Sequence, residues 1–243
     1  MGEKATEPLK RQATSGVVLF GMSPGNGHYT RKNITARLQY LLSTLPDGWT
    51  VHPCVPQGPS VWTYLALGYT EIHARRTARK KWRELSKYAR DAATDNPRYK
   101  DYKWDDLTGG SANASYAAAV ERMEKAYETN DAFRRDIQTT TLGVLEKFGK
   151  ATEECVAVAS RYLLEEFAGL TLVREVLGAH EVVLVYHKRF VPLERFLEGA
   201  PYGLPPVANF SYAVVNAPAD RSTELNDDEP GGFFVCNHDL IKR

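Results

Sequence analysis

Four short apolar runs stand out in the pattern of hydrophobic and polar positions along the chain. They lie at 17–20, 49–55, 181–187 and 210–215, and glycine, proline or polar residues flank them. Short runs rich in β-branched and aromatic residues are typical of buried strands. The pattern therefore predicts four strands, with most of the chain lying between the second and the third.

Between these runs, apolar residues recur every three or four positions, which is the spacing of one helix face. Thr30 is a candidate N-cap for the first helix, and Pro46-Asp47-Gly48 ends it. Residues 64–68 open the next helical region, and a loop occupies 96–110. Further helices are predicted at 71–94, 112–128, 131–148 and 152–168, the last ending near Gly169. Strands alternating with helices predict an α/β fold with a Rossmann-like, mostly parallel sheet flanked by helices.

Composition is that of an ordinary globular protein. Of the 243 residues, 43% are hydrophobic and 25% are charged, and the net charge of +1 indicates no particular partner. We find no repeat or linker, and we expect a disordered tail at 1–14, a single domain at 15–243 and an acidic loop at 220–232 within that domain. No apolar run is long enough for a membrane span.

Cysteine and histidine are scattered. Cys54, Cys155 and Cys236 have neither disulfide nor metal spacing, which indicates the reducing cytoplasm as the location. The six histidines are dispersed as well, so no metal is expected. No glycine-rich dinucleotide or P-loop motif is present, so we expect neither of these nucleotides as a cofactor.

Ser23 is the first candidate for chemistry, because it follows the first predicted strand in Gly21-Met22-Ser23-Pro24-Gly25. Ligands bind at the carboxyl edge of open α/β sheets, and a hydroxyl there is a candidate nucleophile. The letters match the nucleophile elbow of serine hydrolases, but Pro24 has no N–H to serve as the oxyanion donor. Ser23 is therefore either a nucleophile without a histidine triad or an ordinary turn serine.

The helix at 71–94 is strongly basic. Between residues 71 and 90, eight cations stand against two glutamates, which gives a local charge of +6. Several of the cations recur every three or four positions and form one stripe, which suits an RNA phosphate backbone, although a solvated helix face is the alternative. The predicted RNA-binding residues are Arg75, Arg76, Arg79, Lys80, Arg83, Lys87 and Arg90.

Two further pairs are candidates for the site. Tyr162 and Glu166 lie one turn apart on the helix at 152–168, on the border of its apolar stripe. The carboxylate can hold an ammonium and the phenol can donate a proton, although an exposed hydrogen-bonded pair is the plainer alternative. Tyr186 and His187 end the third predicted strand. The alternative is that they are ordinary strand-end residues whose polar ends contact water.

Taken together, these residues and the stretch at 64–69 closely resemble the cyclodipeptide synthases over residues 15–216. Asn26, Tyr186 and His187 resemble the signature of the subfamily named for those residue types. The resemblance implies a catalytic Rossmann-type domain like that of the class I tyrosyl- and tryptophanyl-tRNA synthetases, acting as a monomer.

The resemblance also implies a function: two aminoacyl-tRNAs are joined into a cyclic dipeptide by a ping-pong mechanism through an aminoacyl-enzyme on Ser23. Tyr162 and Glu166 would hold the amino group, Tyr186 would position groups or move a proton, and Asn26 and His187 would orient the site. The pocket for the first amino acid would include Leu19, Gly21, Gly169 and Leu184.

No ATP and no metal would be needed, because the tRNA ester is already activated. Two alternatives remain open at this point. One is another aminoacyl-tRNA-dependent acyltransferase or esterase, and the other is a non-catalytic tRNA-binding module.

Overall fold

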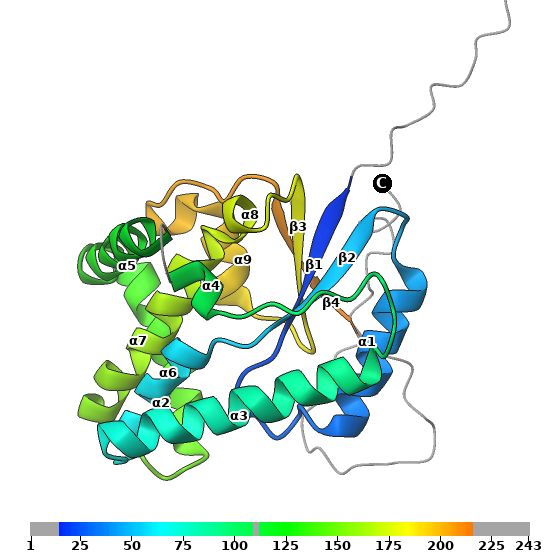
Figure 1. Ribbon diagram of the computed structural model, residues 1–243. Coiled ribbons are helices and arrows are strands. Elements are labelled where there is room, and N and C mark those ends of the chain that lie inside the picture. The colour runs from blue at the N-terminus through cyan, green and yellow to red at the C-terminus, as the bar shows by residue number, and fades with distance from the viewer. Residues whose placement is uncertain (1–14, 109–111, 216–243) are drawn as a thin grey trace, which may run out of the picture.

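A four-stranded parallel sheet forms the centre of the molecule in the computed structural model, which describes residues 15–108 and 112–215 (Figure 1). The strand order is β2-β1-β3-β4, and every neighbouring pair is parallel. The predicted α/β fold with a parallel sheet is confirmed. The strands are β1 (Gly16–Gly21), β2 (Trp49–Cys54), β3 (Glu181–Tyr186) and β4 (Phe210–Val214).

Side chains alternate along β1 and bury into two separate cores, as the two-residue period of a strand requires. Val17 and Leu19 face one core, whereas Val18 and Phe20 face the other. Pro53 lies in β2, at the edge of the sheet, where the missing N–H costs no ladder bond. Both faces of the central strands β1 and β3 are therefore buried in apolar cores, which explains their continuous apolar runs.

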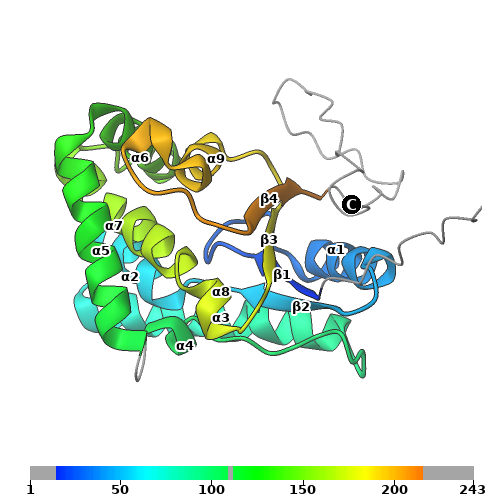
Figure 2. The same ribbon diagram turned by 90° about the horizontal axis from the view of Figure 1, so that it is seen from above.

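Helices cover both faces of the sheet, as Figures 1 and 2 show. On one face lie α1 (Arg31–Thr44) and the long α3 (Glu71–Ala92). On the other lie α5 (Ala112–Thr129), α6 (Asp131–Glu146), α7 (Glu153–Leu170) and α9 (Val191–Glu198). Thr30 caps α1 as predicted, since its hydroxyl accepts a hydrogen bond from the Asn33 N–H.

One prediction about a helix was wrong. Residues 64–68 do not open α3, because they end a separate helix, α2 (Gln57–Ala66). Its sequence begins with prolines and a glycine, which indicate a loop, yet proline is tolerated in a first turn. The helix predicted to end near Gly169 is confirmed, since α7 ends at Leu170.

The remaining short elements escaped the periodicity argument because each has only three or four residues. They are α4 (Asp105–Thr108), inside the predicted loop, α8 (Val173–Val176) and the 3-10 helix η1 (Ala200–Tyr202). Within 15–108 and 112–215, no helix is long and apolar enough to cross a membrane. The predicted tail at 1–14 and the acidic loop at 220–232 lie outside the described residues.

Candidate active site

The loop after β1 brings Ser23 to the carboxyl edge of the sheet. β1 ends at Gly21, and the Met22 N–H donates to the Cys54 carbonyl at 2.9 Å, which ties the end of β1 to the end of β2. The Asn26 N–H closes a turn on the Ser23 carbonyl at 3.2 Å. The side chain of Ser23 is half-buried at this edge. The structure therefore places the hydroxyl where the sequence predicted a ligand site.

Tyr186, the last residue of β3, packs its ring directly against Gly21. A Cβ added to Gly21 would lie 2.8 Å from the Tyr186 ring, closer than real side chains approach. The glycine is required here by this close approach of the ring. The two neighbouring strand ends therefore place Tyr186 beside the Ser23 loop.

Glu166 lies on α7 and is only 4% exposed. Its Oε1 accepts a hydrogen bond from the Tyr186 hydroxyl at 2.8 Å. Burial raises the pKa of Glu166 to about 7, although the hydrogen bond from Tyr186 opposes the rise. Glu166 was expected at the border of the apolar stripe beside Tyr162, but it lies inside the core and pairs with the strand. A carboxyl with this pKa can accept or release a proton near neutral pH.

Tyr162 brings a third polar group to the site. Its hydroxyl oxygen is buried and has no hydrogen-bond partner within 3.5 Å in the described part of the chain. Burial and the nearby Glu166 raise the pKa of this phenol, whereas the neighbouring Ser23 side chain lowers it. Ser23, Tyr162 and Glu166 therefore lie together, although Ser23 and Tyr162 are 139 positions apart by their numbers. An unsatisfied phenol next to Ser23 is well placed to meet a bound substrate.

Asn26 and His187 make their contacts with the loop that carries Ser23. The Asn26 Oδ1 accepts a hydrogen bond from the His28 N–H at 2.9 Å, and the Asn26 side chain is exposed. His187 shares a hydrogen bond of 2.9 Å between its Nδ1 and the Tyr29 hydroxyl. Both residues shape the loop and do not contact Glu166 in the described bonds.

The predicted pocket residues have two different environments. Leu19 and Leu184 are register partners on β1 and β3, and both are buried in the core that contains Tyr186. Gly169 packs under the indole of Trp104, since a Cβ there would lie 2.5 Å from the ring. Gly169 is therefore required for packing against Trp104.

Cys54 and Trp104 are site neighbours that the sequence analysis did not identify. Cys54 ends β2 at the same edge, and burial together with the nearby Glu166 raises the pKa of its thiol. Its position at the end of a predicted strand was a usable signal. Trp104 lies in the stretch expected to be a loop, and no sequence pattern points to it.

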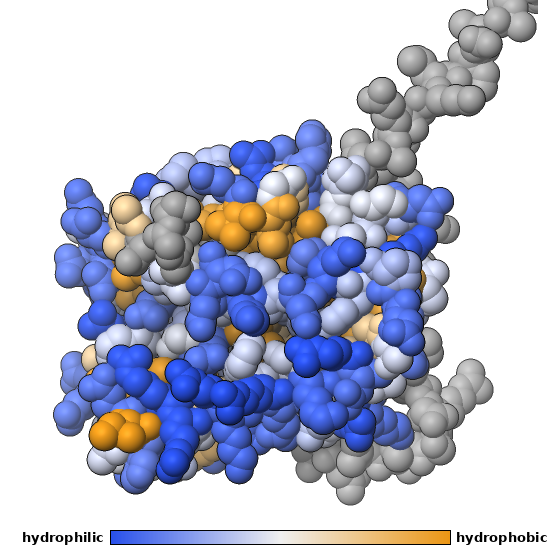
Figure 3. Space-filling model, in the orientation of Figure 1, coloured by the Kyte–Doolittle hydropathy of each residue, from blue (hydrophilic) through white to orange (hydrophobic). Residues whose placement is uncertain are grey.

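The cations of α3 fall into two groups. Arg75, Lys81, Lys87 and Arg90 form ion pairs with Glu71, Glu84, Asp91 and Asp101, respectively. Four others are exposed and have no ion pair in the described residues, and we call these four the cationic face of α3: Arg76, Arg79, Lys80 and Arg83. Figure 3 shows hydrophilic side chains along α3 on this side of the molecule. Only part of the predicted RNA-binding set is therefore without an ion pair in the described residues.

Tyr64 on α2 connects this helix to the Ser23 loop. A Cβ at Gly25 would lie 3.4 Å from the Tyr64 hydroxyl, and Tyr64 packs in one apolar cluster with Ala74 and Ala78 of α3. Tyr64 therefore links the loop that carries Ser23 to the first half of α3.

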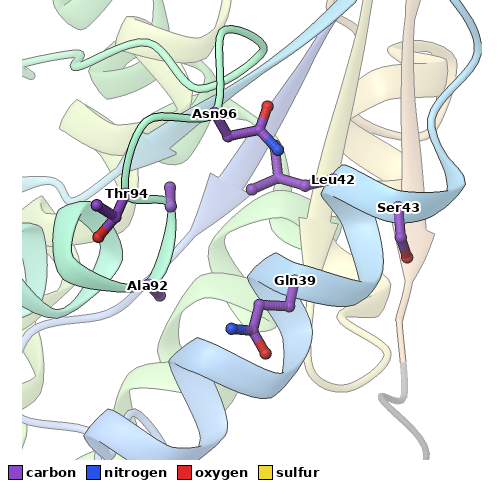
Figure 4. Close-up of a pocket in the computed structure, with 7 residues that line it drawn as sticks. Gln39, Leu42, Ser43, Ala92, Thr94 and Asn96 are labelled. Carbon is purple, nitrogen blue, oxygen red and sulfur yellow. The ribbon is translucent and has the colours of Figure 1, made fainter.

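A cavity of about 200 Å³ lies elsewhere, between α1 and the C-terminal end of α3 (Figure 4). Gln39, Leu42, Thr94 and Asn96 are among its lining residues. Because α1 starts at the carboxyl edge of the sheet and runs back, this cavity lies at the opposite edge from Ser23. It plays no part in the site. Over 15–108 and 112–215, no group of three or more His, Cys, Asp or Glu side chains is arranged to hold a metal ion.

Fold and site together define a Rossmann-like domain that presents a serine beside a buried glutamate and two tyrosines. Comparison with protein families takes this class further, since the family described as cyclodipeptide synthase matches residues 3–217. The chain therefore belongs to the cyclodipeptide synthase family, and it is an enzyme of the aminoacyl-transferring class.

Solved structures of low sequence identity share the fold. A cyclodipeptide synthase from Bacillus thermoamylovorans matches with a TM-score of 0.67 and 20% identity, over 82% of this chain and 87% of that one. One from Candidatus Glomeribacter gigasporarum, solved bound to Phe-tRNAPhe, matches with a TM-score of 0.60 and 17% identity, over 91% and 95%.

A third match bears on the class of fold. The Mycobacterium tuberculosis structure that relates cyclodipeptide synthetases to type I tRNA synthetases matches with a TM-score of 0.63 and 21% identity, over 82% and 84%. This chain shares the fold of that structure. Among curated proteins, no sequence matches this chain.

Proposed function

We propose that this enzyme joins two aminoacyl-tRNAs into a cyclic dipeptide through an aminoacyl ester on Ser23. The observation that supports the proposal best is the meeting of Ser23 and Tyr162 beside the buried Glu166–Tyr186 pair, within a chain of the cyclodipeptide synthase family. The relative that was solved with Phe-tRNAPhe supports aminoacyl-tRNA as the substrate.

In the first step, the Ser23 oxygen attacks the ester carbon of the first aminoacyl-tRNA. The bond to the terminal ribose oxygen breaks, and the tRNA leaves with the serine proton on that oxygen. The vicinal ribose hydroxyl of the tRNA is available to relay this proton. Tyr162 and Glu166 hold the amino group of the bound aminoacyl residue, because a phenol and a carboxylate can both hydrogen-bond to an ammonium.

In the second step, the amine of the seryl-bound residue attacks the ester carbon of the second aminoacyl-tRNA. An amine attacks only after losing its extra proton, and Glu166, with a pKa of about 7, is suited to accept that proton. The second tRNA leaves and a dipeptidyl ester remains on Ser23. The free amine of this dipeptide then attacks the serine ester, which closes the ring and restores the Ser23 hydroxyl.

The cationic face of α3 binds the tRNA acceptor stem in this proposal, because it is exposed, forms no ion pair within 15–108 and 112–215, and belongs to the helix that Tyr64 links to the Ser23 loop. Leu19, Gly21, Gly169 and Leu184 give the first amino acid an apolar environment. Membership of the subfamily with Asn26, Tyr186 and His187 belongs to the proposal too. So do the monomeric state, the cytoplasmic location and a reaction without ATP or metal.

The test uses the full chain expressed in a bacterium, with mass spectrometry of the medium for cyclic dipeptides. The purified protein is then mixed with one kind of aminoacyl-tRNA, and the Ser23 peptide is searched for an added aminoacyl mass. Ser23→Ala should abolish both signals and leave tRNA binding within about twofold. Ser43→Ala, at an exposed serine on α1, is the matched control and should change neither.

Each alternative gives a different result. Another acyltransferase or esterase would acylate Ser23 without releasing a cyclic dipeptide. A tRNA-binding module would bind tRNA and show neither signal. Cyclic dipeptide made at the normal rate by Ser23→Ala would show that Ser23 is not the nucleophile.

A further inference from the structure

A second polar cluster lies behind the Ser23 loop, on the α1 face of the sheet. The Tyr29 hydroxyl and the His187 Nδ1 are 2.9 Å apart. The rings of His28 and His187 are stacked, with centroids 4.2 Å apart and planes within 10° of parallel. The Arg37 guanidinium, on α1, contacts the His28 Nε2. Tyr29 and Arg37 are both buried, so the cluster is an interior one.

The partners in this cluster constrain each other's protonation. A guanidinium has only donors, so the His28 Nε2 must be an acceptor as long as Arg37 contacts it. Burial, together with His28 and Arg37, lowers the pKa of His187 to about 3, so that its ring is neutral at physiological pH. Burial raises the pKa of Tyr29, so its hydroxyl keeps its proton. The cluster therefore contains one fixed charge, on Arg37.

The cluster is coupled to the site through the end of β3. Tyr186 and His187 are consecutive, so their side chains leave opposite faces of the sheet. Tyr186 reaches Glu166 on α7, and His187 reaches Tyr29 in the loop that carries Ser23. The C-terminal end of β3 is therefore in contact with both α7 and the loop that carries Ser23.

His28 also fixes the backbone of the loop. Its N–H donates to the Asn26 Oδ1 at 2.9 Å, and its carbonyl accepts from the Asn33 Nδ2 at 2.8 Å. The segment from Asn26 to His28 is therefore held by its backbone on one side and by the His28 ring on the other. A contact that fixes the orientation of the His28 ring therefore also fixes the turn that begins at Ser23.

Arg37 is costly to keep in this place. It is only 8% exposed, its Nε has no hydrogen-bond partner in the described part of the chain, and burial lowers its pKa. A buried, incompletely paired cation weakens a fold when compared with an apolar side chain of similar size. Stability alone therefore does not account for an arginine here.

We propose that Arg37 is a positioning residue of the reaction. It fixes the His28 ring against His187, and the stacked pair holds the loop so that Ser23 stays beside Tyr162. This role rests on the proposed function, in which Ser23 is acylated. The His28–Arg37 contact is a property of this chain's own loop and helix, in addition to the Asn26, Tyr186 and His187 set.

The experiment compares Arg37→Met with Arg37→Lys in the full chain. Methionine fills the space but donates nothing, so we expect acylation of Ser23 in a single turnover to slow at least tenfold, with tRNA binding unchanged. Lysine restores a donor and should recover most of the rate. Tyr29→Phe, which removes one hydroxyl and keeps the ring, should slow acylation in the same direction.

A second readout needs no substrate. Hydrogen exchange of the backbone amides at 22–30 should be faster in Arg37→Met than in the unchanged protein. In Arg37→Lys, exchange should return toward the rate of the unchanged protein. Arg98→Met is the matched control, because Arg98 is a partly buried arginine that donates to the Leu45 carbonyl at 2.8 Å, just after the end of α1 and away from the Ser23 loop. It should lower stability without changing the loop or the acylation rate.

Normal acylation and normal exchange in Arg37→Met would overturn the positioning role. Equal slowing by Arg98→Met would overturn it too, because the effect would then follow general stability. If the unchanged protein never acylates Ser23, the proposed function fails, and the exchange measurement still decides whether Arg37 holds the loop.

Discussion

Glu166 has an environment unlike that of a surface carboxyl, because it is buried in α7 with a tyrosine hydroxyl as its hydrogen-bond partner. Desolvation favours the neutral acid, and one phenol does not fully compensate the charged form. The residue is therefore held between two protonation states near neutral pH. This arrangement suits proton transfer and weakens the fold.

A stability measurement tests this property of Glu166 directly. Its pKa rises from 4.5 to about 7 on folding, so between these values the folded protein binds a proton that the unfolded chain has lost. Stability must then fall as the pH rises through that window. Glu166→Gln removes the titration, so it should raise the free energy of unfolding by about 3 kcal/mol at pH 8.5 and by little at pH 4.

Urea unfolding at the two pH values checks this expectation. Glu121→Gln, at an exposed residue on α5, serves as control and should change stability by less than about 0.5 kcal/mol at both. An equal gain for Glu166→Gln at both pH values would mean that the carboxyl is not desolvated as described.

Helix α3 has two sides of opposite character. Its Ala74, Ala78 and Ala89 are fully buried, which anchors one side of the helix. Its cationic face is left to solvent without acidic partners in the described residues. Like charges at this spacing repel one another mildly, so the face is stabilised when a polyanion binds.

Charge reversal tests the role of α3. In the triple variant Arg76→Glu, Lys80→Glu, Arg83→Glu, tRNA binding should weaken strongly at low salt, and its logarithmic salt slope should lose about 0.7–0.9 for each phosphate contact removed. Arg122→Glu, Lys125→Glu, Lys150→Glu changes the net charge equally at exposed positions elsewhere and is the control. Equal weakening by the control would mean that only net charge matters.

The whole molecule depends on one sheet that separates two apolar cores. Leu38 on α1 lies in one core, and Phe167 on α7 lies in the other, and both side chains are fully buried. Since β1 and β3 contribute alternate residues to both cores, neither core can form without the strands of the other. We infer that the two faces unfold together.

Two core variants test this cooperativity. Leu38→Ala and Phe167→Ala should each lower the free energy of unfolding by about 3 kcal/mol, and circular dichroism and fluorescence should report one common midpoint in each variant. Phe148→Ala, at a side chain 53% exposed, should change it by less than about 0.5 kcal/mol. Separate midpoints for the two probes would show that the faces are independent.

Sequence patterns predicted those parts of the fold that depend on local periodicity. The strands and long helices were found within one or two residues, because short apolar runs and three-to-four-residue spacing are local signals. Helix α2 was missed because Pro56 and Pro59 resemble a loop, and the packing of Trp104 on Gly169 left no signal in the sequence. Contacts between residues far apart in sequence leave no such pattern.

The sequence by itself determined the strands, the principal helices, the family and the residues Ser23, Tyr162, Glu166 and Tyr186 as candidates. Only the tertiary structure decided that Glu166 is buried and hydrogen-bonded to Tyr186, that four cations of α3 form no ion pair with any described residue, and that Arg37 reaches the Ser23 loop. The physical reason is that desolvation and pairing are set by neighbours in space. Those neighbours come from segments that are distant in the chain and adjacent only in the folded protein.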